Sequence, residues 1–292
     1  MKLKGLLTLK DLSTKSIMDI ISYSLDIKNG LSVSYSNKRF ATLFFENSTR
    51  THYSFIMALK KLGIDVIDCN VGVSSVQKGE SLYDTIKTFE AIGVDGVIIR
   101  HSQDEYFKDL EGINIPIING GDGASNHPTQ SLLDLMTIYE EFSHFKGLKV
   151  CIVGDIVHSR VAHTNIEVME RLGIDVYISG PEEFNDNSAP FIPFDEAIST
   201  MDVIMLLRVQ FERHQEKMKM SKEEYHEKYG MNLERMSQMK KGAIIMHPAP
   251  INRGVEIASE CAEAPCSRIY KQMTNGVYIR MAVISLLLDG KL

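Results

Sequence analysis

The 292-residue sequence has no tryptophan, few cysteines and no long apolar run. Its first residues, MKLKGLLTLKDLS, lack the continuous apolar core of a signal peptide. The longest strongly apolar stretch, near Met281 to Leu288, is too short to cross a bilayer. We therefore expect a cytoplasmic protein that does not bind a membrane.

The four cysteines form no convincing metal site. Cys69 and Cys151 lie in strand-like runs and are predicted to be small core residues. Cys261 and Cys266 resemble half of a metal-binding set, but no second pair follows them. The simplest interpretation is a reduced protein without a metal or other cofactor.

The chain also lacks an excess of positive charge. Its formal net charge of -6 argues against a general nucleic-acid binder, although a local basic pocket stays possible. Two nucleotide-binding signatures are missing as well. No GxxxxGK[ST] motif occurs, and GDIVHSR lacks the second and third glycines of a dinucleotide fingerprint after Gly154.

Short apolar runs alternate with helix-like segments along the chain, which predicts the α/β class with parallel sheets covered by helices on both faces. Several helical segments end at a glycine, namely Gly63, Gly93 and Gly173. The predicted strands are 40–45, 65–69, 96–100, 115–118, 149–153, 176–179, 203–207 and 243–246.

The length favours two domains, and the alternation breaks after the fourth predicted strand. Pro128 begins a long helix over 128–143, which we interpret as a bridge between two α/β halves. The first domain is predicted to span 1–130 and to include the last helix within 275–292, and the second to span 144–272. The charged segment 210–229 is predicted to be a solvated surface element or a mobile loop.

Cations and hydrogen-bond donors follow nearly every predicted strand, where open parallel sheets bind their ligands. The segment FFENSTRTHYSF is the clearest case. Ser48 alone could be an ordinary helix cap, but Arg50 is disfavoured at a helix start unless an anion lies beside it. With Thr49 and Thr51 nearby, this helix start is predicted to bind phosphate.

The motifs FFENSTRT, SSVQKGES, RHSQ, HPTQSLLDL, GDIVHSRVAH, LLRVQFERH, MHPAPINRG and NGVYIRMAV resemble, in the same order, those of the aspartate carbamoyltransferase catalytic chains. The match runs from about Leu6 to Leu288. STRT and HPTQ are shared with the ornithine carbamoyltransferases, so they indicate only the superfamily. LLRVQ and HPAP favour the aspartate branch, because the ornithine enzymes carry an HCLP-type motif and a tryptophan-containing acceptor loop.

The resemblance implies two doubly wound parallel-sheet domains with the active site in the cleft between them. The first would bind carbamoyl phosphate and the second L-aspartate. The implied reaction transfers the carbamoyl group to the aspartate amine, giving N-carbamoyl-L-aspartate and phosphate in de novo pyrimidine biosynthesis, without a cofactor.

The resemblance also assigns residues to carbamoyl phosphate. Ser48, Thr49, Arg50 and Thr51 would hold the phosphate, and Arg100 would reach both the phosphate and the carbonyl oxygen. His127 would bind the same carbonyl oxygen, and Gln130 would lie near the carbamoyl NH2. Ala249 and Pro250 would form a turn, with a cis bond, whose carbonyls accept from the carbamoyl amide. The implied catalytic residues are Arg50, Thr51, Arg100 and His127, which stabilise charge on oxygen and phosphate.

For aspartate, the resemblance assigns Arg160 and Arg208 to the two carboxylates, with help from Gln210. Ser74 and Lys78 would come from the neighbouring chain of a homotrimer with shared active sites. One departure is His163, where the family often has arginine, and we assign it no catalytic role.

Two alternatives remain. The acceptor could be another amine, such as ornithine. More remotely, the chain could be a non-catalytic sensor of a phosphate ligand on the same fold. The sequence does not decide whether separate regulatory chains bind.

Overall fold

The computed structural model describes residues 3–69, 71, 79–209 and 220–292. The chain divides into two compact units, one formed by Met1–Met136 with Met273–Leu292 and the other by Thr137–Gln272. The divisions fall inside helix α4 (Pro128–Phe142) and helix α10 (Ile269–Leu288). Each unit contains one parallel sheet, so the predicted α/β class with two parallel sheets is confirmed.

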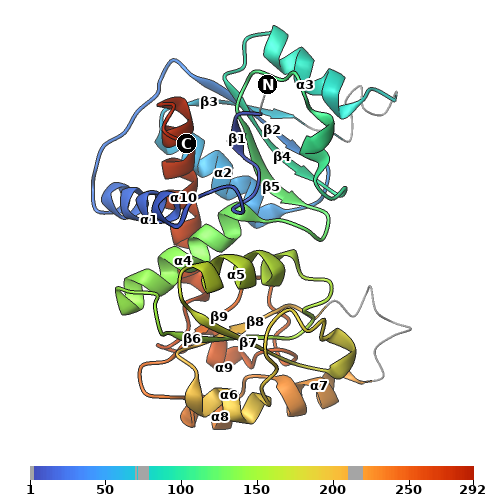
Figure 1. Ribbon diagram of the computed structural model, residues 1–292, viewed down its shortest axis with the longest axis vertical. Coiled ribbons are helices and arrows are strands. Elements are labelled where there is room, and N and C mark those ends of the chain that lie inside the picture. The colour runs from blue at the N-terminus through green and yellow to red at the C-terminus, as the bar shows by residue number, and fades with distance from the viewer. Residues whose placement is uncertain (1–2, 70, 72–78, 210–219) are drawn as a thin grey trace. The chain divides into compact units, whose positions relative to one another are not determined.

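The sheet of the first unit has the strand order β1-β5-β4-β2-β3, and its strand pairs are parallel (Figure 1). Its strands are β1 (Gly5–Leu6), β2 (Arg39–Phe44), β3 (Asp65–Cys69), β4 (Gly96–His101) and β5 (Ile117–Asp122). Its helices include α1 (Thr14–Lys28), α2 (Thr49–Lys61) and α3 (Leu82–Ala91), with a 3-10 turn, η3 (Tyr106–Asp109). The chain moves outward from β2 to β3 and then back past β2 to β4. Right-handed crossovers in opposite directions put α2 and α3 on opposite faces of the sheet.

The second unit repeats this arrangement with the strand order β7-β6-β8-β9. Its strands are β6 (Lys149–Val153), β7 (Asp175–Ser179), β8 (Val203–Leu206) and β9 (Ile244–Met246). Its helices are α5 (Arg160–Arg171), α6 (Phe194–Thr200), α7 (Lys222–Tyr229), α8 (Leu233–Ser237) and α9 (Ser259–Ala262), with η4 (Glu182–Phe184) as a 3-10 turn. Here the chain moves from β6 to β7 and then back past β6 to β8. Helices α5 and α6 therefore cover opposite faces.

Helices cover both faces of each sheet, so the central strands have no face in contact with water. Their sequences are therefore continuous apolar runs. Val97, Ile98 and Ile99 of β4 are all fully buried. The predicted glycine stops are confirmed, since Gly63 follows α2 with a φ of +70° and Gly93 follows α3 with a φ of +90°. Only glycine adopts such angles without strain.

Several local expectations need correction. The two-residue strand β1 was not predicted, β5 begins at Ile117 rather than at 115, and α10 begins at Ile269 rather than at 275. Cys151 is buried as expected, but Cys69 is half-buried because β3 is an edge strand. Within the charged segment, 210–219 lies outside the described residues, whereas α7 buries Tyr225 completely.

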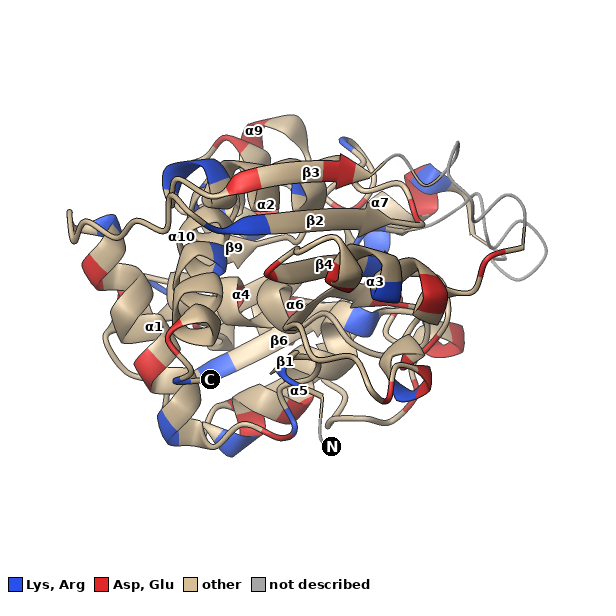
Figure 2. Cartoon of the chain, turned by 90° about the horizontal axis from the view of Figure 1, so that it is seen from above, with Lys and Arg blue, Asp and Glu red and all other residues tan. Residues whose placement is uncertain are grey.

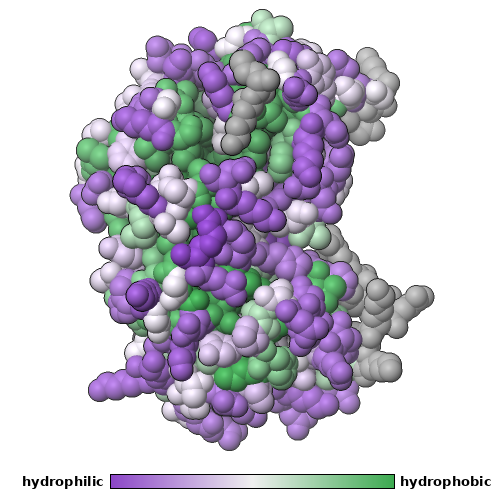
Figure 3. Space-filling model, in the orientation of Figure 1, coloured by the Kyte–Doolittle hydropathy of each residue, from purple (hydrophilic) through white to green (hydrophobic). Residues whose placement is uncertain are grey.

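The surface carries charges of both signs. Figure 2 shows acidic and basic residues interspersed on the helices of both units. On the face drawn in Figure 3, hydrophilic side chains surround smaller hydrophobic areas. Among the described helices, none has the length and apolar content needed to cross a membrane.

Candidate active site

In the first unit, the crossovers from neighbouring strands diverge at the carboxyl ends of β2 and β4, and we call such a switch point a crevice. Open α/β sheets bind their ligands at such a point. The two strands are paired side by side, with Phe44 opposite Arg100. The STRT segment follows β2 and Arg100 lies near the end of β4, so the strand order brings the two predicted phosphate contacts to one edge.

Helix α2 begins at this edge with an unusual cap. Ser48 occupies the N-cap position, but its side chain makes no capping hydrogen bond. By contrast, Ser13, Ser81 and Ser221 each accept a hydrogen bond from the helix they cap. The ordinary explanation for Ser48 as a cap therefore fails, and its hydroxyl remains available to a ligand at the helix start.

The neighbouring residues differ in exposure. Thr49 and Arg50 are exposed, whereas Thr51 is buried. The first turn of α2 contains no acidic residue. A cation at this end of a helix is electrostatically unfavourable, and a bound anion would reverse that effect.

Arg100 is held by partners from two different segments, Gly120 on β5 and Glu46 after β2. Its Nη1 donates to the Gly120 carbonyl at 3.2 Å, and its Nε lies 3.3 Å from a carboxylate oxygen of Glu46. The Arg100 side chain is only 11% exposed, so this ion pair is largely shielded from water. An anion bound by Arg100 would compete with Glu46 for the guanidinium. Glu46 was not among the predicted site residues, because it meets Arg100 only through the pairing of β2 with β4.

A glycine brings Arg100 and His127 together. A Cβ atom at Gly121 would lie 3.1 Å from Arg100 Nη1 and 3.5 Å from His127 Cδ2. Gly121 also has a φ of +119°, which other residues rarely adopt. Its N–H donates to the buried side chain of Asn119 at 2.8 Å, which fixes the bend. The two side chains therefore share one glycine-lined space at the end of β5.

His127 and Gln130 lie at the start of helix α4. The His127 carbonyl accepts from the Gln130 N–H at 3.0 Å, and Pro128 takes the first helical position, where its missing donor costs nothing. Both side chains are largely buried, with exposures of 4% for His127 and 8% for Gln130. The first unit thus gathers Ser48, Thr51, Arg100 and His127, with Gln130 one turn along α4.

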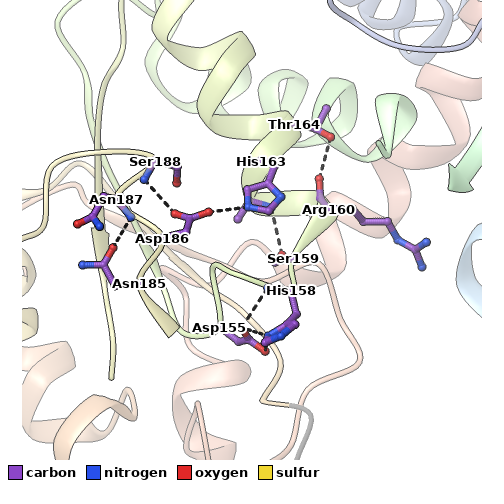
Figure 4. A network of polar contacts seen from close by, with 11 residues as sticks. Asp155, His158, Ser159, Arg160, His163, Thr164, Asn185, Asp186, Asn187 and Ser188 are labelled. Carbon is purple, nitrogen blue, oxygen red and sulfur yellow. Dashed lines mark hydrogen bonds and ion pairs between the residues drawn. The ribbon is translucent and has the colours of Figure 1, made fainter. Parts of the chain in front are cut away.

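The second unit has its own crevice, between the carboxyl ends of β6 and β8. Arg160 begins α5 after β6, and Arg208 follows β8 by two residues. Ser159 caps α5 by accepting from the Ala162 N–H at 3.1 Å. Figure 4 shows the Arg160 guanidinium pointing away from the histidines near it. Like Arg50, Arg160 places a cation in the first turn of a helix.

The histidines around Arg160 are engaged in local contacts (Figure 4). His158 lies 2.9 Å from a carboxylate oxygen of Asp155, and His163 lies 2.8 Å from Asp186. Burial disfavours ionisation of Asp186, but the hydrogen bonds from Ser188 and His163 outweigh this and lower the pKa of its carboxyl. His163 therefore ties α5 to the loop carrying Asp186, which gives it a structural contact.

A second buried network shapes the turn at Ala249 and Pro250. The bond between these residues is cis, as the resemblance implied. The Ala249 N–H donates to Nδ1 of His247 at 2.8 Å, and Nε2 of His247 lies 3.2 Å from the Glu256 carboxylate. A neutral His247 must therefore carry its proton on Nε2, facing Glu256. Glu256 was not among the predicted site residues, because its partners are not apparent from spacing alone.

The same network reaches the segment that carries Arg208. The Asn252 N–H donates to Glu256 at 2.5 Å, and the Asn252 carboxamide donates to the Val209 carbonyl at 2.9 Å. Val209 also packs in a buried cluster with Tyr225 and Val255. The turn and the residue after Arg208 are thus held by one set of contacts.

Three predicted site residues, Ser74, Lys78 and Gln210, lie outside the described residues. In the described part of the chain, no group of three or more His, Cys, Asp or Glu side chains is arranged to hold a metal ion.

Known protein families match both units. The model described as "Aspartate/ornithine carbamoyltransferase, carbamoyl-P binding domain" matches residues 4–140. The model described as "Aspartate/ornithine carbamoyltransferase, Asp/Orn binding domain" matches residues 146–287. The chain is 51% identical over 292 residues to the aspartate carbamoyltransferase catalytic subunit of Staphylococcus carnosus, covering 99% of this chain and 97% of that protein.

Solved structures agree in fold. The aspartate transcarbamoylase of Trypanosoma cruzi in complex with carbamoyl phosphate superposes with a TM-score of 0.87 at 26% identity, covering 97% of this chain and 96% of that one. The same enzyme in complex with carbamoyl phosphate and aspartate gives a TM-score of 0.87 at 27% identity, with the same coverage.

Proposed function

The chain belongs to the aspartate/ornithine carbamoyltransferase family, and on that premise we propose that it is an aspartate carbamoyltransferase. It transfers the carbamoyl group of carbamoyl phosphate to the amine of L-aspartate, in pyrimidine biosynthesis. The observation that carries the proposal is the pairing of arginines with the two crevices. Arg50 and Arg100 lie at the crevice of one unit, and Arg160 and Arg208 at that of the other.

The first crevice suits carbamoyl phosphate. A phosphate dianion would take the free N–H groups at the start of α2, the Ser48 hydroxyl and the guanidinium of Arg50. Thr51, Arg100 and His127 would then donate to the carbonyl oxygen. The arrangement of Arg100 and His127 around Gly121 supports this, because both side chains already lie close together.

The second crevice suits a dicarboxylic acid. Two guanidinium forks can each bind one carboxylate, so a pair of arginines favours an acceptor that carries two carboxylates. We assign Arg160 and Arg208 to this role, with Gln210. The Ala249 and Pro250 carbonyls would accept from the carbamoyl NH2, and the contacts of His247 and Glu256 hold that turn in place.

The chemistry needs no activated side-chain nucleophile. The neutral amine of aspartate attacks the carbamoyl carbon and forms the new C–N bond, and negative charge develops on the carbonyl oxygen. The donors around that oxygen stabilise it, and losing one of them typically costs about 2.7–4 kcal/mol. The C–O bond to phosphate then breaks, and the departing phosphate takes the amine proton. Much of the remaining acceleration comes from holding both substrates in the reactive orientation.

We further propose a homotrimer in which Ser74 and Lys78 complete the active site of the neighbouring chain. This assignment follows the resemblance of SSVQKGES to the corresponding family segment. The similar Staphylococcus protein is described as a catalytic subunit, so we also consider separate regulatory chains as partners of this chain.

An acceptor assay tests the function. The purified protein is given carbamoyl phosphate with aspartate, ornithine or N-acetylornithine, and the ureido product is measured. Of the three amines, we expect only aspartate to be carbamoylated. Turnover with ornithine would establish the rival acceptor, and binding of carbamoyl phosphate without turnover of any amine would establish a sensor.

A further inference from the structure

The carboxamide of Gln130 is held from one side only. Its Nε2 donates to a carboxylate oxygen of Asp134 at 2.9 Å, one turn further along α4. Asp134 is fully buried and Gln130 is 8% exposed. A carboxylate only accepts hydrogen bonds, so the NH2 of Gln130 must face Asp134. The oxygen of the carboxamide therefore faces the opposite way.

The buried carboxylate of Asp134 has a cation nearby. Arg280 on α10 is only 2% exposed, and its guanidinium carbon lies 4.7 Å from the centre of the Phe55 ring. Burial lowers the pKa of Arg280 to about 9, and the charge of Asp134 opposes this effect. An isolated buried charge would be costly, so each group makes the other tolerable.

The Arg280 side chain occupies space that is left by the missing side chain of Gly276. A Cβ atom at Gly276, one turn before Arg280 on α10, would lie 2.5 Å from Arg280 Nη1 and 3.1 Å from Leu133 Cδ2. Phe55, whose ring the guanidinium contacts, lies one turn after Thr51 on α2. Arg280 is thus wedged where the two helices that begin at the first crevice approach α10.

We propose that Asp134, with Arg280 as its countercharge, is a positioning residue that turns the Gln130 oxygen toward the ligand. The inference rests on the proposed function, in which Gln130 meets the carbamoyl NH2. An oxygen in that position accepts from an N–H donor and gains nothing from a methyl group. The Gln130–Asp134 pair would thereby select a carbamoyl group over an otherwise similar acyl group.

The test compares two ligands that differ at one group. Acetyl phosphate keeps the phosphate and the carbonyl of carbamoyl phosphate but carries a methyl in place of the NH2. In Asp134→Asn, the new carboxamide can donate to Gln130, so the Gln130 side chain can reverse and present its NH2 to the ligand. We expect the preference for carbamoyl phosphate over acetyl phosphate to fall by about three- to tenfold, the scale of one hydrogen bond. Affinity for inorganic phosphate should stay within about twofold.

Asp19→Asn is the matched control, because Asp19 also lies on a helix beside a cation but is exposed. It should keep the wild-type preference. If Asp134→Asn also keeps that preference, or weakens both ligands equally, Asp134 does not orient Gln130 and the proposal is wrong.

A second variant covers poor folding. Asp134→Asn leaves Arg280 buried without its countercharge, so we expect a lower melting temperature. Asp134→Asn with Arg280→Met removes both charges and should recover part of that loss while keeping the reduced preference. A recovered preference would contradict the proposal.

A measurement on the ligand-free protein separates this inference from the proposed function. With 15N-labelled glutamine, the Gln130 NH2 should exchange slowly with water in the wild type and faster in Asp134→Asn. Equal exchange rates would overturn the positioning role. Failure of the wild type to bind carbamoyl phosphate would instead overturn the proposed function.

Discussion

Replacing Gly121 by alanine should damage the active site more than the fold. The φ of +119° makes any L side chain strained there, at a cost of about 1–3 kcal/mol. The added Cβ would also lie 3.1 Å from Arg100 Nη1 and 3.5 Å from His127 Cδ2. Arg100 is fixed by Glu46 and Gly120, so it must shift by some tenths of an ångström against these contacts.

Gly30 provides a matched control in the same unit. Its φ is +110°, and a Cβ atom there would meet nothing within 4 Å. Both variants should therefore lose similar stability in thermal unfolding, but only Gly121→Ala should lose activity. Because a displacement of about 1 Å can cost about a hundredfold in rate, we expect kcat to fall by roughly ten- to a hundredfold. Equal turnover in the two variants would refute the argument that Gly121 positions Arg100 and His127.

Three further predictions concern the ion pairs and the shared site. The hydrogen bond from Arg268, helped by Lys271, lowers the pKa of Glu141 to about 2, so Glu141→Gln should lose about 1 kcal/mol of stability after solvent screening. Because the folded pKa lies below the unfolded one, this difference is full above about pH 4.5 and disappears as the pH falls toward 2. Arg208→Ala should greatly weaken a phosphonate–aspartate mimic in calorimetry but barely affect inorganic phosphate. Arg50→Ala and Lys78→Ala proteins, each nearly inactive, should regain activity in about a quarter of their sites after random subunit exchange.

Each of these three predictions would be contradicted by a specific result. Parallel pH profiles of unfolding for Glu141→Gln and wild type would mean that its ion pair adds nothing to stability. Equal losses for mimic and phosphate would mean that Arg208 does not bind the acceptor. An inactive mixture, after exchange is verified by native mass spectrometry, would place Lys78 outside the neighbour's site.

Most strands and helices could be predicted from the sequence, because their apolar patterns are local. The strand β6 matches its predicted range of 149–153, because a short apolar run bounded by turn residues is typical of a buried strand. Strand β1 was missed because its two residues become a strand only by pairing with β5. Helix α10 begins at Ile269, six residues before the predicted start at 275.

Site residues could be predicted where they lie together in one segment. They could not be predicted where the order of the strands brings them together. The STRT segment signalled an anion by itself, through an arginine at a helix start. Glu46 and Gly121 carry no such signal, because Glu46 meets Arg100 only when β2 pairs with β4, and Gly121 meets it only when β4 pairs with β5. Asp134 was within reach of sequence analysis, since residues four apart on a helix face each other. Glu256 was not, because its partners His247 and Asn252 meet it only through a folded turn.

The arginine at the start of α2 has a consequence for the lifetime of the protein in the cell. A phosphate bound at the start of α2 would meet the positive end of the helix and the Arg50 cation together, which adds to the stability of the folded chain. A ligand that binds only the folded chain also stabilises it by mass action, by about 2.7 kcal/mol at a hundredfold excess over its Kd. When carbamoyl phosphate runs short, we expect this chain to open more often and to be degraded faster by cellular proteases. Supply of the substrate would then set the amount of enzyme as well as its rate.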